Sequence, residues 1–314
     1  MSAEDWFEGP PSIYNSDVPE LRINDSTSED CLSVSIWAPT KVLNSPSESK
    51  SPVIVWLTGG AFLVDGSTIP YRVPTHWIES DQRQIVVSAN CRITIFGFPN
   101  AAGLDPQEQN LGLLNQRLGL EWCPDMPRVR NQIMLSGPTL PALQVPAPNH
   151  QHFSFVTQSL GFEGNNSADE LEFTRQQPAE DLIGFIKEHT LAGNEPVLSF
   201  RPIVDNRGIF SYYEETATSG NFSKLPTATM ARHRGLHALV FRFLLNPSGI
   251  CSFPNISPGP WERVYHGSDL PLIFGTYSWY RGPSTHLEKM LSKAWQELYL
   301  AFAEEGSEGI PKFG

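Results

Sequence analysis

A glycine pair directly after an apolar segment is the feature of this sequence best suited to chemistry. Gly59 and Gly60 follow the β-branched run 53–57 (VIVWL), which predicts a buried strand. Glycine lets the backbone turn sharply, so N–H groups in this loop can point into open space. We expect the N–H groups of Gly60 and Ala61 to form an oxyanion hole, which holds the negative charge that develops in acyl transfer. An isolated glycine pair is more often a plain turn, but the strand before it favours the catalytic interpretation.

The serine that such a loop serves is missing from the sequence. The motif G-x-S-x-G, the strained elbow that presents a nucleophilic serine, occurs nowhere in the 314 residues. Ser136 and Ser248 each precede a glycine, but neither has the upstream glycine that packs an elbow between strand and helix. A serine without a base in hydrogen-bonding reach is a poor nucleophile. We therefore assign no nucleophile.

Charge and hydropathy exclude several classes of partner. The chain has 34 acidic and 22 basic residues, a net charge of −12, which argues against a nucleic-acid partner. No apolar run approaches membrane-spanning length, so we expect no membrane span. Residues 1–5 (MSAED) lack the basic start and apolar core of a secretory signal, so the sequence as written predicts no leader. It indicates neither a compartment nor an oligomeric state.

Histidines and cysteines form no metal-binding pattern. His150 and His152 are spaced as H-x-H, but no nearby carboxylate or third ligand supports zinc. The cysteines lack metal-ligand spacing and could form zero, one or two disulfides: Cys31, Cys91, Cys123 and Cys251. We expect neither a metal nor a cofactor.

Strand-like and helix-like segments alternate along the chain. Apolar runs predict strands at 31–37, 53–57, 84–90, 198–204 and 239–245. Helical periodicity predicts helices at 111–122, 168–177, 179–189 and 287–303, whereas 41–52 and 138–152 read as irregular. This order predicts an α/β fold with a mostly parallel central sheet flanked by helices.

Several segments together resemble the type-B carboxylesterase, lipase and cholinesterase family of α/β-hydrolases. They are SEDCL (28–32), VWLTGGAF (55–62), ANCR (89–92) with FGF (96–98), NLGLLNQRLGLEW (110–122), PIVD (202–205), YHGSDLP (265–271) and the final helix 291–302. They follow the family order over most of residues 28–303. The resemblance implies an α/β-hydrolase fold in a single domain over residues 1–314, with its core at about 28–303. It also implies a fungal member, a small carboxylic ester as substrate, no cofactor, and His266 as the catalytic histidine.

Two family segments are missing, so the resemblance implies an incomplete fold. The family places a strand, the serine elbow and a helix after the position of Trp122; here a short proline-broken link leads directly to Ile133. A second gap, between Pro226 and Ala231, falls where the family carries the acid of its triad. Asp205, Glu214 and Glu215 could be acids, but solvated carboxylates are the simpler interpretation. Loss of a central strand predicts exposed strand edges.

Smaller departures point the same way. The resemblance places an acidic residue at Asn115, where it would pair with an arginine such as Arg92, so the amide removes an ion pair. Phe162 and Phe173 fall where the family often carries a disulfide.

Two functions are compatible with these residues. In the first, the chain is a carboxylic ester hydrolase, with His266 as general base and Gly60 and Ala61 as oxyanion donors, impaired or inactive because it lacks a serine. In the second, it is a non-catalytic pseudoenzyme or interaction protein, or a mis-spliced product of an active esterase gene.

Overall fold

The computed structural model describes residues 28–45, 50–64, 66–122, 129–135, 149–221, 225, 227–229, 240–242, 269–279 and 283–310. Its helices are α2 (Thr40–Asn44), α3 (Thr75–Ser80), α4 (Thr94–Gly97), α5 (Leu111–Trp122), α6 (Gln151–Ser159), α7 (Ser167–Arg175), α8 (Ala179–Leu191), α9 (Tyr213–Ser219), α10 (Leu270–Phe274) and α11 (His286–Glu305). Short 3-10 turns are η3 (Pro70–Arg72), η4 (Pro106–Glu108), η5 (Thr276–Ser278) and η6 (Gly306–Glu308). No helix in these ranges is long and apolar enough to span a membrane.

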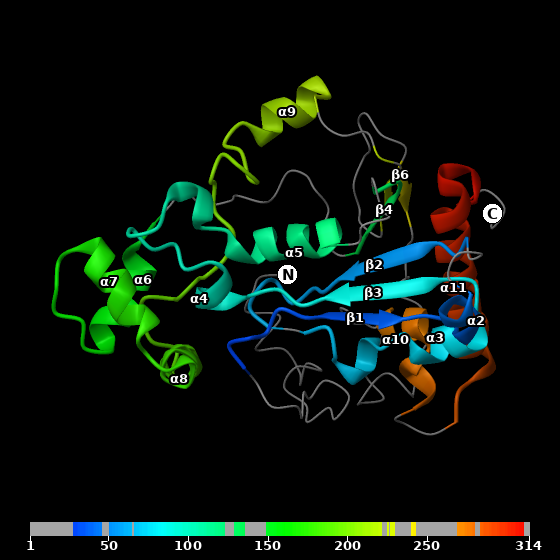
Figure 1. Cartoon of the computed structure of the whole chain (residues 1–314), viewed down its shortest axis with the longest axis horizontal. Helices are drawn as coiled ribbons and strands as arrows, with labels where there is room; N and C mark the ends of the chain where they lie inside the picture. Colours follow the sequence, from blue (N-terminus) through cyan, green and yellow to red (C-terminus); the bar gives the residue numbers. More distant parts are fainter. Residues whose placement is uncertain are drawn as a thin grey trace.

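The first sheet lies at the centre of the molecule (Figure 1). It has the order β1 (Val34–Trp37), β3 (Ile85–Ala89), β2 (Val53–Leu57). β3 pairs antiparallel with β1 and parallel with β2. Because β3 has neighbours on both edges and is buried, with Val86 only 1% exposed, it forms the core of this half of the fold.

The second sheet is separate from the first. It consists of the parallel strands β4 (Gln132–Met134), β5 (Thr227–Thr229) and β6 (Val240–Arg242), in that order. Three of the four described strand pairings are parallel and only β1–β3 is antiparallel, so the prediction of a mostly parallel arrangement is confirmed. The described strands divide into two sheets, with β2 and β4 as outer strands. The connection from β3 to β4, residues 90–131, contains α4 and α5 and is long enough for a parallel crossover, but the outer edges of β2 and β4 pair with no described strand.

Helices α3, α10 and α11 pack with the first sheet around one apolar core. Trp77, Ile273, Phe274 and Leu300, each at most 1% exposed, meet Val86 of β3 there. α11 begins with a capping box, in which the Thr285 hydroxyl accepts from the Glu288 N–H while Glu288 Oε2 accepts from the Thr285 N–H at 2.7 Å. α5 packs closely on β3, since a Cβ at Gly119 would lie only 2.9 Å from that of Ala89.

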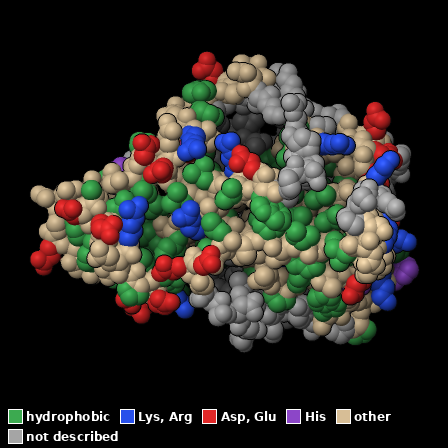
Figure 2. All heavy atoms as spheres, viewed as in Figure 1, with side chains coloured by type: hydrophobic (Ala, Val, Ile, Leu, Met, Phe, Trp, Pro, Cys, Tyr) green, Lys and Arg blue, Asp and Glu red, His purple; other side chains and the backbone are tan. Residues whose placement is uncertain are grey.

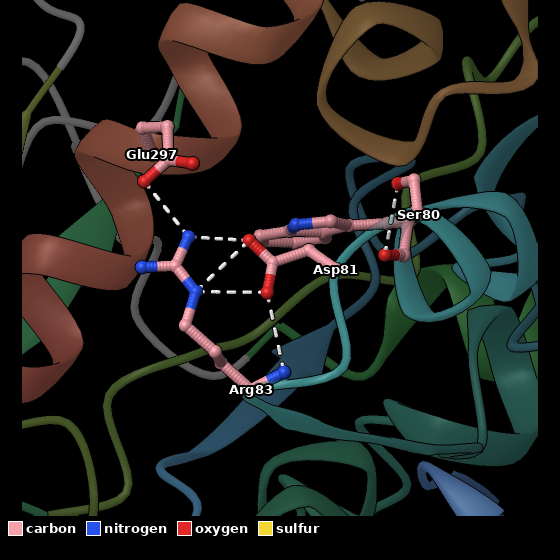
Figure 3. Close-up of polar contacts among 5 residues, drawn as sticks. Ser80, Asp81, Arg83 and Glu297 are labelled. Carbon is pink, nitrogen blue, oxygen red and sulfur yellow. Dashed lines mark hydrogen bonds and ion pairs between the residues drawn. The ribbon is translucent and has the colours of Figure 1, made fainter.

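A cluster of polar side chains holds the loop before β3 against α11 (Figure 3). The Arg83 guanidinium donates to both carboxylate oxygens of Asp81, and its Nη2 lies 2.8 Å from Oε2 of Glu297 on α11. The hydrogen bond from Arg83 lowers the pKa of Asp81. Because these side chains are partly exposed to solvent, their ion pairs contribute little to the free energy of unfolding, and their main effect is to hold the loop in place.

Helices α6, α7 and α8 form a projection at one end of the molecule (Figure 1), around a second apolar core that includes Phe153, Val156, Leu182 and Phe200. The helices predicted at 168–177, 179–189, 111–122 and 287–303 are confirmed within two residues at each end, as are strands 53–57 and 84–90. The strands predicted at 31–37 and 239–245 form over shorter spans, as β1 and β6.

The strand predicted at 198–204 is wrong, because this segment is extended but pairs with no described strand. Asn110, directly before α5, binds the backbone of this segment instead. The Ile203 N–H donates to Asn110 Oδ1 at 3.0 Å, and the Asn110 side-chain amide donates to the Ile203 C=O at 2.8 Å. Within the segments predicted as irregular, Thr40–Asn44 forms α2, and α6 begins at Gln151.

Candidate active site

The loop after β2 holds three consecutive residues in the left-handed region. The φ angles are 85° at Gly60, 53° at Ala61 and 64° at Phe62. Left-handed backbone suits glycine, but it costs about 1–2 kcal/mol at an alanine or phenylalanine. The surrounding structure offsets this cost, because Phe62 C=O accepts from Thr94 N–H at 2.8 Å and the Phe62 ring packs edge-on against Phe98 at 4.9 Å.

This geometry leaves two backbone donors available. The Gly60 carbonyl turns back into the loop and accepts from the N–H groups of Leu63 and Val64, at 3.0 and 3.2 Å. Within the described ranges, no acceptor engages the N–H group of Gly60 or Ala61, and both residues line a cavity. Two adjacent N–H groups of this kind can hold an oxyanion or a carboxylate.

The cavity lies between the two sheets and has a volume of about 2310 Å³. Residues 52–57 on β2 and 130–135 on β4 both line it, so we call it the interstrand cavity. Its floor contains Trp77, Ile273, Phe274 and Tyr299 from the first core. The cavity is therefore apolar between the two strands and polar near the loop.

No pair of nucleophile and base is found among the described residues that line the interstrand cavity. Ser51 is the only serine among them, and no histidine is present. Ser51 precedes β2 whereas Gly60 follows it, so extended chain of about 3.3 Å per residue places them on the order of 20 Å apart or more. The predicted base His266 lies outside the described residues, as do Ser136 and Ser248.

The three candidate acids lie elsewhere. Glu215 is on the surface of α9, and Glu214 belongs to the same helix. Asp205 was interpreted as a solvated carboxylate, and this is wrong, because it is 6% exposed. Its Oδ1 accepts from the N–H groups of Arg207, Gly208 and Ile209, at 3.0, 2.9 and 2.8 Å. Asp205 is thus the internal acceptor of a tight loop.

A buried carboxylate that sequence reasoning missed lines the interstrand cavity. Asp269 is 6% exposed, and burial raises its pKa to about 6 despite hydrogen bonds from backbone N–H groups, including that of Leu270, and the positive charge of Arg72. Both Asp269 and Arg72 line the cavity. The apolar run that follows Asp269 (LPLIF, 270–274) was the sequence signal that could have predicted its burial.

Asp269→Asn is expected to stabilise the protein at neutral pH. The folded-state pKa lies above the unfolded value of about 3.8, so the native state disfavours the charged form. Stability should therefore fall as pH rises from about 4 to about 6 and then level off. A shift of about two pKa units sets an upper limit of roughly 3 kcal/mol on the gain at pH 7. Urea unfolding at pH 4 and pH 7 measures it; an equal effect at both values would show that Asp269 ionises normally.

The contact predicted between positions 92 and 115 is present, with an amide in place of a carboxylate. Asn115 Oδ1 accepts from Arg92 Nε at 3.0 Å and from the Arg92 N–H at 3.3 Å. A hydrogen bond thus holds the guanidinium where the family resemblance implies an ion pair.

The predicted site of a lost disulfide holds an aromatic pair. The rings of Phe162 and Phe173 lie 5.5 Å apart at 46°, so the two positions are neighbours in space. Their contact links the loop after α6 to α7 by packing instead of a covalent bond. Cys31 is a free thiol.

Comparisons with known proteins agree with this geometry. A family model described as the carboxylesterase family matches residues 8–126. The chain is 31% identical to a chlorogenic acid esterase of Aspergillus niger over 370 residues, which cover 95% of this chain and 70% of the relative. It is 32% identical to secreted lipase 5 of Gibberella zeae over 381 residues, which cover 92% of this chain and 70% of the relative.

The fold is similar to that of a solved PNB esterase, with a TM-score of 0.67 and 20% identity over 92% of this chain and 78% of that one. The structure thus has an incomplete α/β-hydrolase fold. From the identity to the esterase and the lipase, together with the loop at Gly60, we conclude that the chain belongs to the carboxylesterase family.

Proposed function

We propose that this carboxylesterase-family protein keeps the anion-binding loop of an ester hydrolase but does not hydrolyse esters. The observation that carries the proposal is the lining of the interstrand cavity. The donors of Gly60 and Ala61 face a space whose described walls hold no histidine and only one serine, Ser51, at the far end of β2. Without a nucleophile and base, only a residual acceleration of roughly 10³–10⁴ over water can come from binding and the oxyanion hole.

The comparisons support an internal deletion as the cause. The alignment with the chlorogenic acid esterase runs over 370 positions and the chain has 314 residues, so at least 56 positions exist only in the relative. We propose that the serine elbow belongs to these positions, between Trp122 and Ile133, and that the triad acid is lost between Pro226 and Ala231. The ancestral activity would be hydrolysis of a small carboxylic ester in a fungus, with His266 as general base.

A fluorophosphonate probe tests the absence of an activated serine. We expect the purified chain to remain unlabelled and to accelerate cleavage of a short-chain nitrophenyl ester by no more than roughly 10³–10⁴ over buffer. The chlorogenic acid esterase from Aspergillus niger serves as the positive control. Labelling that disappears in His266→Ala would contradict the proposal, since it would require a serine activated by that imidazole.

Sequencing the transcript separates a mis-spliced product from a settled pseudoenzyme. If a coding segment for an elbow lies between the codons of Trp122 and Ile133 in other transcripts of the gene, the chain is the product of a skipped segment. If every transcript joins these codons directly, the non-catalytic chain is the gene's own product.

A further inference from the structure

The interstrand cavity has two strand edges as its opposite walls. Among the described strands, β2 pairs only with β3 and β4 pairs only with β5, while residues 52–57 and 130–135 line the same cavity. The outer edge of β2 carries a row of backbone N–H and C=O groups able to pair with an added strand. The apolar residues at the ends of β2 are also unusually exposed, with Val53 at 36% and Leu57 at 38%.

The two edges begin at the same end of the cavity. Asn131, just before β4, donates from Nδ2 to the Phe302 carbonyl at 2.9 Å, near the end of α11. Glu304, also near the end of α11, lines a smaller cavity of about 500 Å³ together with Lys50 and Pro52, just before β2. The amino ends of both strands therefore lie beside the same end of α11.

The other end of β2 leads to the anion-binding loop. β2 ends at Leu57, and the unengaged N–H groups of Gly60 and Ala61 follow after two residues. A strand that lies parallel to β2 therefore has its carboxyl end beside these donors. An antiparallel strand would place a cationic amino end there instead, where the donors repel it.

Charge at the cavity matches an anionic occupant. Five basic side chains and two acidic ones line it, although the whole chain carries a net charge of −12. They are Lys50, Arg72, Arg130, Lys187 and Arg201, against Asp269 and Glu304. Figure 2 shows that hydrophobic side chains also gather over the central strands on the face that it presents. The combination of apolar walls with local positive charge suits an apolar segment that ends in a carboxylate.

We propose that the interstrand cavity binds the C-terminal tail of a partner protein as an added strand. About five apolar residues, the length of β2, would lie extended along the outer edge of β2 and parallel to it, and the terminal carboxylate would accept from the N–H groups of Gly60 and Ala61. This inference rests on the anion-binding loop of the proposed function, and its test measures peptide binding and not ester hydrolysis.

Fluorescence polarisation with a labelled peptide tests the proposal. The probe is fluorescein-Gly-Thr-Val-Ile-Val-Phe-Val with a free C-terminal carboxylate. We expect saturable binding to the full chain, weakened about tenfold or more when the same peptide carries a C-terminal amide. Equal binding of acid and amide overturns the proposal, and so does the lack of saturation up to roughly 0.1 mM.

Substitutions at Leu57 locate the peptide within the cavity. Leu57 lines the cavity next to the donor loop and is already part-exposed, so a polar residue there is compatible with folding. Leu57→Asp should weaken the acid peptide about tenfold or more, and Leu57→Lys should not weaken it, because only the first repels the carboxylate. Leu43→Asp is the matched control, since Leu43 is 68% exposed on α2 and lies outside the cavity. A similar loss of affinity in Leu57→Asp and Leu43→Asp would overturn the assignment. A dimer seen by analytical ultracentrifugation that the peptide does not dissociate would overturn it as well.

Discussion

Gly112→Ala is expected to destabilise the protein by about 3 kcal/mol, although alanine is the better helix former. Gly112 lies in the first turn of α5, where a Cβ would meet the Arg92 carbonyl oxygen at 2.5 Å and Phe98 Cζ at 2.6 Å. The first of these atoms is backbone, and Phe98 is fully buried, so neither can move aside without shifting the loop that ends in α4. Overpacking in such a site exceeds the gain of up to about 1 kcal/mol from helix propensity.

Gly184→Ala is the matched control for this prediction. Gly184 is inside α8, and a Cβ there meets nothing within 4 Å. The same exchange should therefore stabilise the protein by about 0.5–1 kcal/mol. Chemical denaturation of both variants provides the measurement. Two stabilised variants would mean that α5 does not pack against the Arg92 loop as described.

Asp205→Ala is expected to cost about 3–4 kcal/mol, because it removes one acceptor from several buried donors at once. The N–H groups of Arg207, Gly208 and Ile209 lose Oδ1, and the Asn110 amide loses its 2.7 Å bond to Oδ2. Asn110 also holds the backbone of Ile203, so the loss extends to the segment before the loop. Thermal unfolding measures the effect, with Glu215→Ala on the exposed face of α9 as a control expected near zero.

The same carboxylate predicts a pH dependence with a defined sign. Burial by itself would raise the pKa of Asp205, but hydrogen bonds from Ile209, Arg207, Asn110 and Gly208 outweigh burial and hold it below the usual value. Its contribution is therefore present above the unfolded pKa of about 3.9 and is lost as pH falls through the lower folded value. Asp205→Asn should abolish this part of the acid sensitivity. If the stability of Asp205→Asn falls at acid pH as steeply as that of the unchanged protein, the charge of Asp205 does not cause the acid sensitivity.

Local signals predicted the elements of this fold well. The run 53–57 is apolar and β-branched, and 287–303 repeats its apolar residues at helical spacing; both elements form as expected. The short helices α3 and α10 were missed, because five or six residues carry too little periodicity to reveal a helix. The segment 198–204 has the composition of a strand, but the distant side chain of Asn110 decides its pairing.

The candidate site was likewise predictable only where its features depend on local sequence. The loop at Gly60 and Ala61 was predictable because a strand followed by two glycines is a local pattern. The burial of Asp205 was not, since it depends on the distant side chain of Asn110, whereas the apolar run after Asp269 is a local signal for the burial of that residue. The neighbouring positions of Phe162 and Phe173, and of Arg92 and Asn115, followed from the family resemblance and not from the residues alone.

The division of the strands into two sheets has a consequence for cooperativity. Hydrogen-bonded ladders couple the opening of one strand to the next, and here that coupling stops at the outer edges of β2 and β4. β3 lies between two partners in a dry core, whereas β4 and β5 are three residues long and pair over three positions. The amide hydrogens of β4 to β6 should thus exchange with solvent through local opening, whereas those of β3 should exchange only through global unfolding. We therefore expect the two sheets to open as separate foldons joined by one chain.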